Sequence, residues 1–158
     1  MFRHTHKQVR RALVMARCEA IEWNHSYLGC EHLLIGLLRT SDSTAAAALG
    51  ELKIDVTQIR ALLTGLVCPG TEVVTKMRLP QTPRAKRATR SYAYHEAHKI
   101  GRRVIGTEHL LLALLRDRDN LAVKLLEGLG LTPDQIRKAV MAHVQPPMKV
   151  RNDHERVN

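Results

Sequence analysis

The feature that most constrains this chain of 158 residues is an internal repeat with a constant offset of 77 residues. The eleven residues from Gly29 to Arg39 recur from Gly106 to Arg116, and eight of the eleven positions are identical. The same offset joins further identical positions: Thr5 and Thr82, Glu19-Ala20 and Glu96-Ala97, Leu49 and Leu126, and Gln58-Ile59-Arg60 and Gln135-Ile136-Arg137. A constant offset along most of the chain indicates duplication of one structural unit.

Each copy is predicted to contain four helices, because apolar residues recur at helical spacing and Leu and Ala dominate, while aromatic residues make up only 3%. The expected helices are Thr5 to Trp23 and Thr82 to Gly101, the two Glu-His-Leu-Leu segments, Thr44 to Leu49 and Leu121 to Leu126, and the segments from Asp55 to Val67 and from Thr132 to Val144. Capping side chains precede several of these helices, and prolines follow two of the caps. The leucine stripes of the Glu-His-Leu-Leu helices are predicted to form the core.

Chain breakers divide the sequence into two repeats at residues 1–67 and 82–145, joined by a linker at 68–81. Repeats and linker together are expected to form one compact domain. Pro146 and Pro147 end the last predicted helix, and the charged segment at 146–158 is expected to be a flexible tail.

Several functional classes are disfavoured by the sequence. It contains no G-x-x-x-x-G-K-[ST] loop, so nucleotide hydrolysis through such a loop is not expected, and no cofactor is predicted. No apolar run approaches the ~20 residues that a membrane-spanning helix needs, and no signal peptide is visible. The three cysteines are expected to be reduced in a cytoplasmic protein. A zinc site made by Cys18, Cys30, His25 and His32 matches no usual spacing, so no metal is predicted.

The formal net charge of +10 favours polyanions or acidic protein surfaces as partners. Binding to nucleic acid is therefore an alternative. It is disfavoured because the predicted helices carry apolar stripes and the positive charge is scattered, instead of lying on one recognition helix. Nothing in the sequence requires an oligomer, so a monomer is expected.

The duplicated Gly-[Cys/Thr]-Glu-His-Leu-Leu-x-x-Leu-Leu-Arg segment resembles the N-terminal repeat domain of Clp AAA+ unfoldases, especially ClpC and ClpA, here without their ATPase modules. The opening of the second repeat, Thr82-Pro83-Arg84-Ala85-Lys86, and the approach Trp23 to Gly29 are also similar to that family. The resemblance covers about residues 1–145. It implies an all-α fold, a pseudo-twofold bundle of eight helices, and a docking or adaptor role toward substrates, adaptors or an unfoldase in protein quality control. An excised recruitment domain of a longer ClpC-like ATPase is an alternative.

The resemblance also implies a site for phosphoarginine. Glu31 and Glu108 match the glutamates that hold its guanidinium group, and Thr5 and Thr82 match threonines near its phosphate. Arg84 and Lys86 are the nearest basic residues in the second repeat. A purely structural role remains open, because a carboxylate in the first turn of a helix interacts favourably with the helix dipole. Catalysis by His32 or His109 is not expected, because each neighbouring Glu and His point to different faces of the helix.

Overall fold

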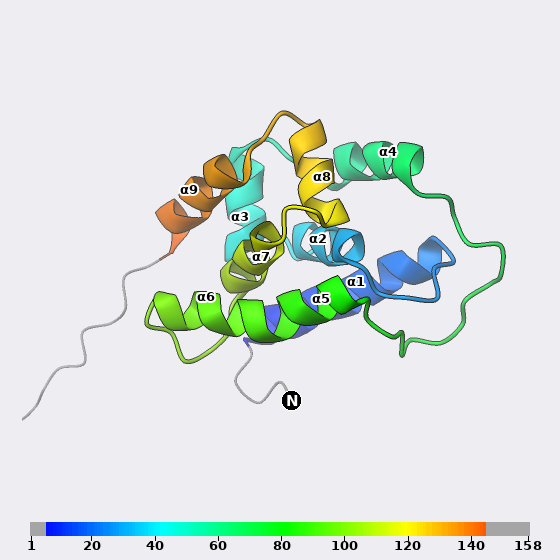
Figure 1. The fold of residues 1–158 in the computed structure, drawn as a ribbon, viewed down its shortest axis with the longest axis horizontal. Coiled ribbons are helices and arrows are strands. Elements are labelled where there is room, and N and C mark those ends of the chain that lie inside the picture. Colours follow the sequence, from blue (N-terminus) through cyan, green and yellow to red (C-terminus); the bar gives the residue numbers. More distant parts are fainter. Residues whose placement is uncertain (1–5, 145–158) are drawn as a thin grey trace, which may run out of the picture.

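The structure is a computed structural model that describes residues 6–144, and within that range it is all-helical (Figure 1). The first repeat contains α1 (Lys7–Glu22), α2 (Cys30–Leu38), α3 (Thr44–Glu51) and α4 (Val56–Leu66). The second contains α5 (Pro83–Arg87), a π-helical turn η1 (Ala88–Tyr92), α6 (Ala93–Lys99), α7 (Thr107–Arg116), α8 (Leu121–Gly128) and α9 (Pro133–His143). Because α5, η1 and α6 follow one another without a gap, each repeat has four helical rods, which confirms the predicted architecture. Thr5 and the proposed tail at 146–158 lie outside the described residues.

The helix starts reproduce the duplication. The helices α2 and α7, α3 and α8, and α4 and α9 each begin 77 residues apart. The side chains of Asp55, Thr82 and Thr132 accept hydrogen bonds from backbone N–H groups in the first turns of α4, α5 and α9, as predicted. Local capping chemistry therefore sets these three boundaries.

The two repeats interlock through exchanged neighbours. The third helix of each repeat packs against the fourth helix of the other, since α3 contacts α9 and α8 contacts α4. The two leucine-rich helices α2 and α7 also touch each other and lie near the centre of the molecule in Figure 1. Their leucines form the core, as predicted: Leu33, Leu34, Leu110, Leu111 and Leu114 are all no more than 1% exposed.

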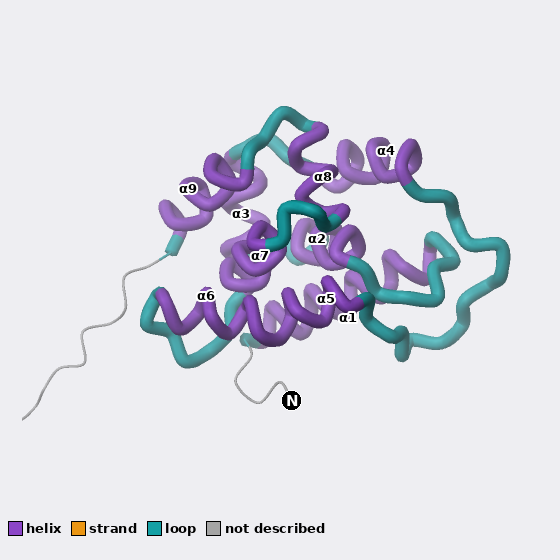
Figure 2. The backbone as a smooth tube through the Cα atoms, in the orientation of Figure 1, coloured by secondary structure: helices purple, strands orange, loops and turns teal. Residues whose placement is uncertain are grey.

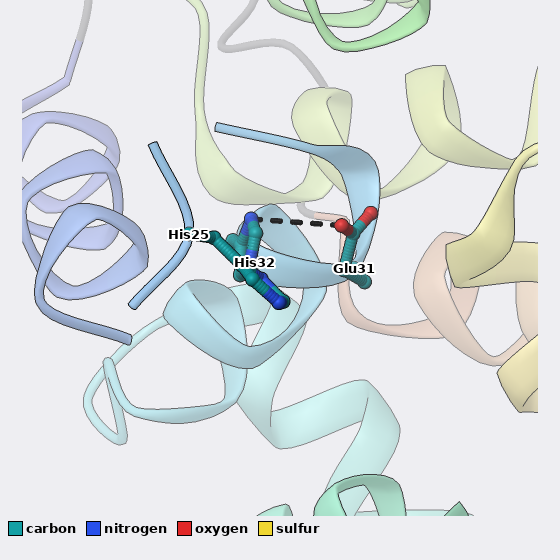
Figure 3. Close-up of side chains that lie close together, drawn as sticks. All are labelled: His25, Glu31 and His32. Carbon is teal, nitrogen blue, oxygen red and sulfur yellow. Dashed lines mark hydrogen bonds and ion pairs between the residues drawn. The ribbon is translucent and has the colours of Figure 1, made fainter. Parts of the chain in front are cut away.

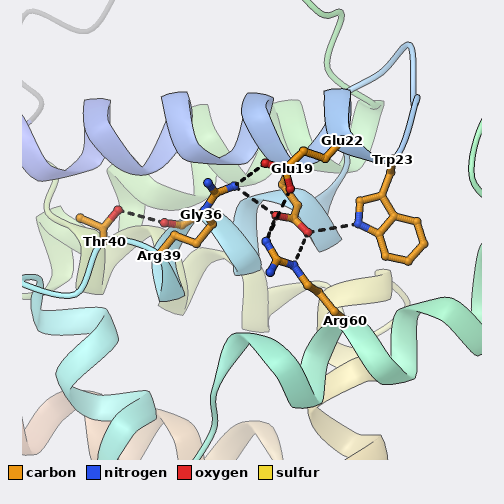
Figure 4. A network of polar contacts seen from close by, with 7 residues as sticks. All are labelled: Glu19, Glu22, Trp23, Gly36, Arg39, Thr40 and Arg60. Carbon is orange, nitrogen blue, oxygen red and sulfur yellow. Dashed lines mark hydrogen bonds and ion pairs between the residues drawn. The ribbon is translucent and has the colours of Figure 1, made fainter. Parts of the chain in front are cut away.

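Each repeat contains a buried glutamate that joins its first helical rod to the end of its second helix and to its fourth helix, and Figure 4 shows the network of the first repeat. Glu19 of α1 is fully buried, and it accepts two hydrogen bonds from Arg60 of α4, at 2.6 and 2.8 Å, and one from Arg39 at 3.2 Å. Trp23 adds an indole N–H donor at 3.1 Å. Burial alone raises the pKa of Glu19, but these donors and positive charges bring it below its ordinary value.

The second repeat contains a corresponding network of one glutamate and two arginines, at positions 77 residues further on, with Ile100 in place of Trp23. Glu96 is 2% exposed, accepts hydrogen bonds from Arg137 at 3.2 and 3.4 Å, and lies 3.6 Å from Arg116. All three residues are identical to their counterparts in the first repeat. The duplication has therefore preserved a set of interacting side chains as well as a helix pattern.

The π-turn is the main departure from the predicted helices, and it coincides with a sequence difference between the repeats. At Gly36, an added Cβ would lie 2.3 Å from the backbone oxygen of Ala12, so α1 and α2 approach closely there. The second repeat has Ala113 at the corresponding position, and α7 packs against the π-turn that contains Thr89, the counterpart of Ala12. The additional methyl group of Ala113 gives a physical reason for the wider turn, because it needs space where the first repeat has none.

The segment between α4 and α5 contains no helix and runs as a long loop (Figure 2). It is attached to the first repeat at both ends. The N–H of Gly70 donates to the carbonyl of Trp23 at 2.8 Å. Leu28 donates to the carbonyl of Pro80 at 2.9 Å and accepts from the N–H of Thr82 at 3.0 Å, which forms an isolated parallel bridge.

Candidate functional site

The two glutamates singled out in the sequence line two separate pockets, and each pocket is built from both repeats. The Glu31 pocket has a volume of about 390 Å³ and lies among the first residues of α2, α5 and α8. The Glu108 pocket has a volume of about 520 Å³ and lies among the first residues of α7, α1 and α3, the loop at 101–106 and the end of α9. Each pocket thus places a carboxylate of one repeat beside the first helix of the other.

The carboxylates fold back over the glycines that precede their helices. A Cβ added at Gly29 would lie 2.4 Å from the carboxylate of Glu31, and one added at Gly106 would lie 2.4 Å from the carboxylate of Glu108. The two glutamates differ in exposure, at 7% for the side chain of Glu31 and 19% for that of Glu108. Burial raises the pKa of Glu31, although a hydrogen bond from its own backbone N–H acts in the opposite direction.

Thr82 lies in the Glu31 pocket, where its hydroxyl caps α5 by accepting a hydrogen bond from the N–H of Ala85 at 3.2 Å. Thr5, its counterpart, is outside the described residues. The residues that follow it, His6 and Gln8, line the Glu108 pocket. The structure therefore brings Thr82 together with the glutamate of the opposite repeat.

The predicted basic residues of the second repeat lie on two sides of α5. Arg84 lines the Glu31 pocket, but its guanidinium group binds both carboxylate oxygens of Asp117. Burial raises the pKa of Asp117, but the hydrogen bonds from Arg84 and from the N–H of Asp119, together with the charges of Arg84 and Arg87, bring that pKa below its usual value. Lys86 lies elsewhere, in a pocket that contains neither glutamate. In the Glu108 pocket, Arg102 and Arg103 supply positive charge.

His25 and His32 form a buried hydrogen-bonded chain beside Glu31 (Figure 3). The N–H of Gly29 donates to Nδ1 of His32 at 2.9 Å, so Nε2 of His32 carries its proton and donates to Nδ1 of His25, also at 2.9 Å. Nε2 of His25 then donates to the carbonyl of Cys68 at 3.0 Å. Burial lowers the pKa of His32 to about 4, in agreement with a neutral ring.

In this hydrogen-bonded chain, every ring nitrogen of the two histidines forms a hydrogen bond. The ligand atoms of His25, Glu31 and His32 lie within 4.8 Å of one another, and this is the one group of three or more such residues found between residues 6 and 144. A metal ion at that point would have to displace at least one of the hydrogen bonds. The group contains no cysteine, so the combination of Cys18 and Cys30 with both histidines is not assembled there.

The second repeat lacks this hydrogen-bonded chain of two histidines. Arg102 stands where the first repeat has His25. The N–H of Gly106 still donates to Nδ1 of His109, at 2.8 Å, but Nε2 of His109 is buried and has no hydrogen-bond partner in the part of the chain that the structure describes. A carboxylate oxygen of Glu108 lies 3.8 Å from this nitrogen. His109 lines the Glu108 pocket, so this nitrogen is a polar group that a ligand can satisfy.

The sequence did not predict that acidic residues lie in and beside the Glu31 pocket, or that each pocket is lined by residues of both repeats. Asp117 and Asp119 lie in a charged stretch that has no distinctive motif. The buried networks around Glu19 and Glu96 were also missed, although a signal was present, because each buried glutamate and its two arginines are identical at the 77-residue offset.

No helix between residues 6 and 144 combines the length and apolar character that crossing a bilayer requires. In known structures, the fold is similar to the N-terminal domain of the chaperone ClpD from Arabidopsis thaliana, with a TM-score of 0.75, 18% sequence identity, and coverage of 90% of this chain and 95% of that chain. It is also similar to a ClpV N-domain solved as a complex with a VipB peptide, with a TM-score of 0.66, 20% identity and coverage of 91% of both chains.

The sequence matches the Clp repeat (R) N-terminal domain family over residues 4–94 and 89–158. It is 32% identical over 141 residues to the chaperone protein ClpB of Oceanobacillus iheyensis, and 33% identical over 141 residues to the negative regulator of genetic competence ClpC/MecB of Bacillus subtilis. Each alignment covers 89% of this chain and 17% of the relative, so the chain spans about a sixth of the length of these relatives. This chain belongs to the Clp repeat N-terminal domain family.

Proposed function

We propose that this chain is a docking module that binds protein substrates or adaptors for a Clp unfoldase, and that its two glutamate pockets recognise phosphorylated arginine side chains. The duplicated pocket carries the proposal: in each copy, a carboxylate at the start of a leucine-rich helix faces the start of the first helix of the other repeat. A carboxylate pairs with a guanidinium group, and N–H groups at a helix start receive a phosphate.

The dimensions and chemistry of the pockets support binding. Their volumes of about 390 and 520 Å³ fall in the range of small-ligand sites. Nδ1 of His32 and of His109 already accepts a backbone hydrogen bond, so these histidines are poorly placed to act as general bases. We therefore propose that the chain acts by binding and not by catalysis. A monomer in the cytoplasm is part of the same proposal.

The distribution of charge favours tighter binding of phosphoarginine in the Glu108 pocket than in the Glu31 pocket. Arg103 lines the Glu108 pocket together with Nε2 of His109, which forms no hydrogen bond with the described residues and lies 3.8 Å from a carboxylate oxygen of Glu108. In the Glu31 pocket, Arg84 and Arg87 both lie near Asp117, and Asp119 also lines the pocket, so these carboxylates offset the positive charge that a phosphate would meet. We expect phosphoarginine to bind first at Glu108.

The test is isothermal titration of a short peptide that carries one phosphoarginine, with the unphosphorylated peptide and a phosphoserine peptide as controls. Removing a charged hydrogen-bond partner costs about 1.5–3 kcal/mol, so Glu108→Gln should weaken binding by roughly 10- to 150-fold. Glu31→Gln should have a smaller effect, and the exposed Glu127→Gln is the matched control. Equal affinity for the three peptides, or equal losses from Glu108→Gln and Glu127→Gln, would contradict the proposal.

The docking role is tested by a pull-down with a purified Clp unfoldase and its adaptors, with a basic protein of similar charge as the control. Filter binding to nucleic acid at ~150 mM salt tests the alternative, because nonspecific electrostatic binding weakens steeply with salt. Retention of nucleic acid at that salt without enrichment of any Clp partner would favour the alternative.

A further inference from the structure

A third pocket, which we call the basic pocket, lies away from both glutamates. It has a volume of about 560 Å³, and it is lined by the following residues: Arg17, Met77, Arg78, Leu79, Pro80, Gln81, Lys86 and Arg90. These residues come from α1, the end of the segment between the repeats, α5 and the π-turn. Lys86 and Arg90 are four residues apart, so they share a face of the rod. Arg84 and Arg87 point to a different side, where both lie near Asp117.

Between residues 6 and 144, the four cations of the basic pocket have no acidic partner. Among the residues that the structure describes, no carboxylate lies within 4.0 Å of Arg17, Arg78, Lys86 or Arg90, and none lines the pocket. Elsewhere, arginines are commonly paired: the side chains of Arg39, Arg60, Arg84, Arg87, Arg116 and Arg137 all lie near aspartate or glutamate. Four like charges around one concavity repel one another until an anion binds there.

Hydrogen bonds hold the walls of this pocket in place. The segment at 79–82 is fixed to Leu28 by the parallel bridge described above. The side chain of Gln81 accepts a hydrogen bond from the hydroxyl of Thr89 at 3.1 Å, and Thr89 belongs to the π-turn that also carries Arg90. The linker wall and the helical wall are therefore joined, so the pocket is largely formed before any ligand arrives.

The pocket also has an apolar wall, which narrows the choice of ligand. Met77, Leu79 and Pro80 line it, and Met77 is 48% exposed. An inorganic anion or a sugar-phosphate backbone gains nothing from contact with these side chains, whereas a peptide that contains both carboxylates and aliphatic side chains uses both walls. We propose that the basic pocket binds an acidic segment of a partner protein in which aspartate or glutamate residues flank an apolar side chain.

This proposal is independent of phosphoarginine recognition, because the two surfaces share no lining residue. The probe is a fluorescent heptapeptide of alternating glutamate and leucine, measured by anisotropy at ~150 mM salt against a peptide with glutamine in place of glutamate. Arg90→Glu and Lys86→Glu should each weaken binding by at least about tenfold, since each replaces an attraction by a repulsion. Lys138→Glu makes the same change in net charge on an exposed face of α9, and it should weaken binding by less than about twofold.

Backbone amide shifts in an NMR titration locate the site directly, and they should change most at Gln81, Lys86 and Arg90. Circular dichroism of each variant shows whether it is folded. Glu108→Gln should leave binding of the acidic peptide unchanged, so failure of one proposal does not imply failure of the other. Equal losses from Lys138→Glu and Arg90→Glu would overturn the proposal, as would equal binding of the glutamate and glutamine peptides. Tighter binding of tripolyphosphate or single-stranded DNA, lost in the same variants, would instead assign the pocket to a phosphate polyanion.

Discussion

Replacing Glu19 with glutamine tests whether the buried network stabilises the first repeat. The substitution preserves the shape of the side chain but removes the negative charge that Arg39 and Arg60 face. Removing one member of a buried ion pair typically costs about 3–5 kcal/mol. The side chains of Arg39 and Arg60 are 26% and 41% exposed, so water can solvate part of the charge that remains. We therefore expect the free energy of unfolding to fall by about 2–3 kcal/mol.

Urea unfolding, followed by circular dichroism, measures this loss. With an m-value of about 2 kcal/mol/M, the midpoint should fall by roughly 1 to 1.5 M without a change in slope. The melting temperature should fall by about 4–12 °C. Glu22→Gln is the matched control, because Glu22 lies 3.7 Å from the same two arginines but its side chain is 56% exposed. Surface pairs contribute little, so this variant should lose less than about 1 kcal/mol.

The same network predicts a dependence on pH. Since the folded-state pKa of Glu19 is below its ordinary value, its contribution is complete above the unfolded-state pKa of about 4.3, and it is lost as the pH falls through the folded-state pKa. The wild-type protein should therefore lose more stability on acidification below about pH 4.5 than Glu19→Gln does. If Glu19→Gln and Glu22→Gln have the same midpoint, or if the acid losses are equal, the network does not stabilise the fold as reasoned.

Three further predictions concern other buried positions. Gly36→Ala should destabilise the protein by about 1–3 kcal/mol in urea unfolding, because the added methyl group meets a backbone carbonyl of α1. Gly50→Ala should instead stabilise it by roughly 0.5–1 kcal/mol, because a Cβ added there has no heavy atom within 4 Å and alanine favours the helix. A destabilised Gly50→Ala would contradict this contrast. Because the folded-state pKa of His32 is about 4, stability should fall from pH 6.5 down to pH 4 by up to ~1.4 kcal/mol per pH unit, and His32→Asn should show a flatter profile at lower overall stability. Iodoacetamide should label the exposed Cys68 before Cys30, since burial raises the pKa of Cys30 to about 12; mass spectrometry that finds Cys30 modified first would show that this region opens.

Much of the fold could be predicted because its signals are local. A capping side chain acts on N–H groups two or three residues away, so the starts of α4, α5 and α9 follow from Asp55, Thr82 and Thr132. The π-turn could not be predicted in this way. It depends on the contact between η1 and α7, which are separated in sequence and meet only in the folded protein.

The candidate site was predictable in part. The positions of Glu31 and Glu108 in the first turns of their helices follow from the repeat and its glycines. The basic residues that accompany these two glutamates could not be predicted from the repeat. Arg84 is bound to Asp117, and Lys86 lies across the rod in the basic pocket, although the two are only two residues apart in sequence. Their separation follows from the helical turn and from the acidic loop that reaches one side of it.

The amino-acid sequence alone determined the duplication, the helical class, the approximate helix limits and the leucine-rich core, because these depend on periodicity and on interactions within a few residues. Only the tertiary structure decided how the repeats interlock, with α3 against α9 and α4 against α8. The packing of the two repeats also places each glutamate beside the opposite repeat, and it gathers around one pocket four cations that have no acidic partner between residues 6 and 144. The physical reason is that a pocket is formed by side chains that are distant in sequence, and their meeting depends on how whole helices pack.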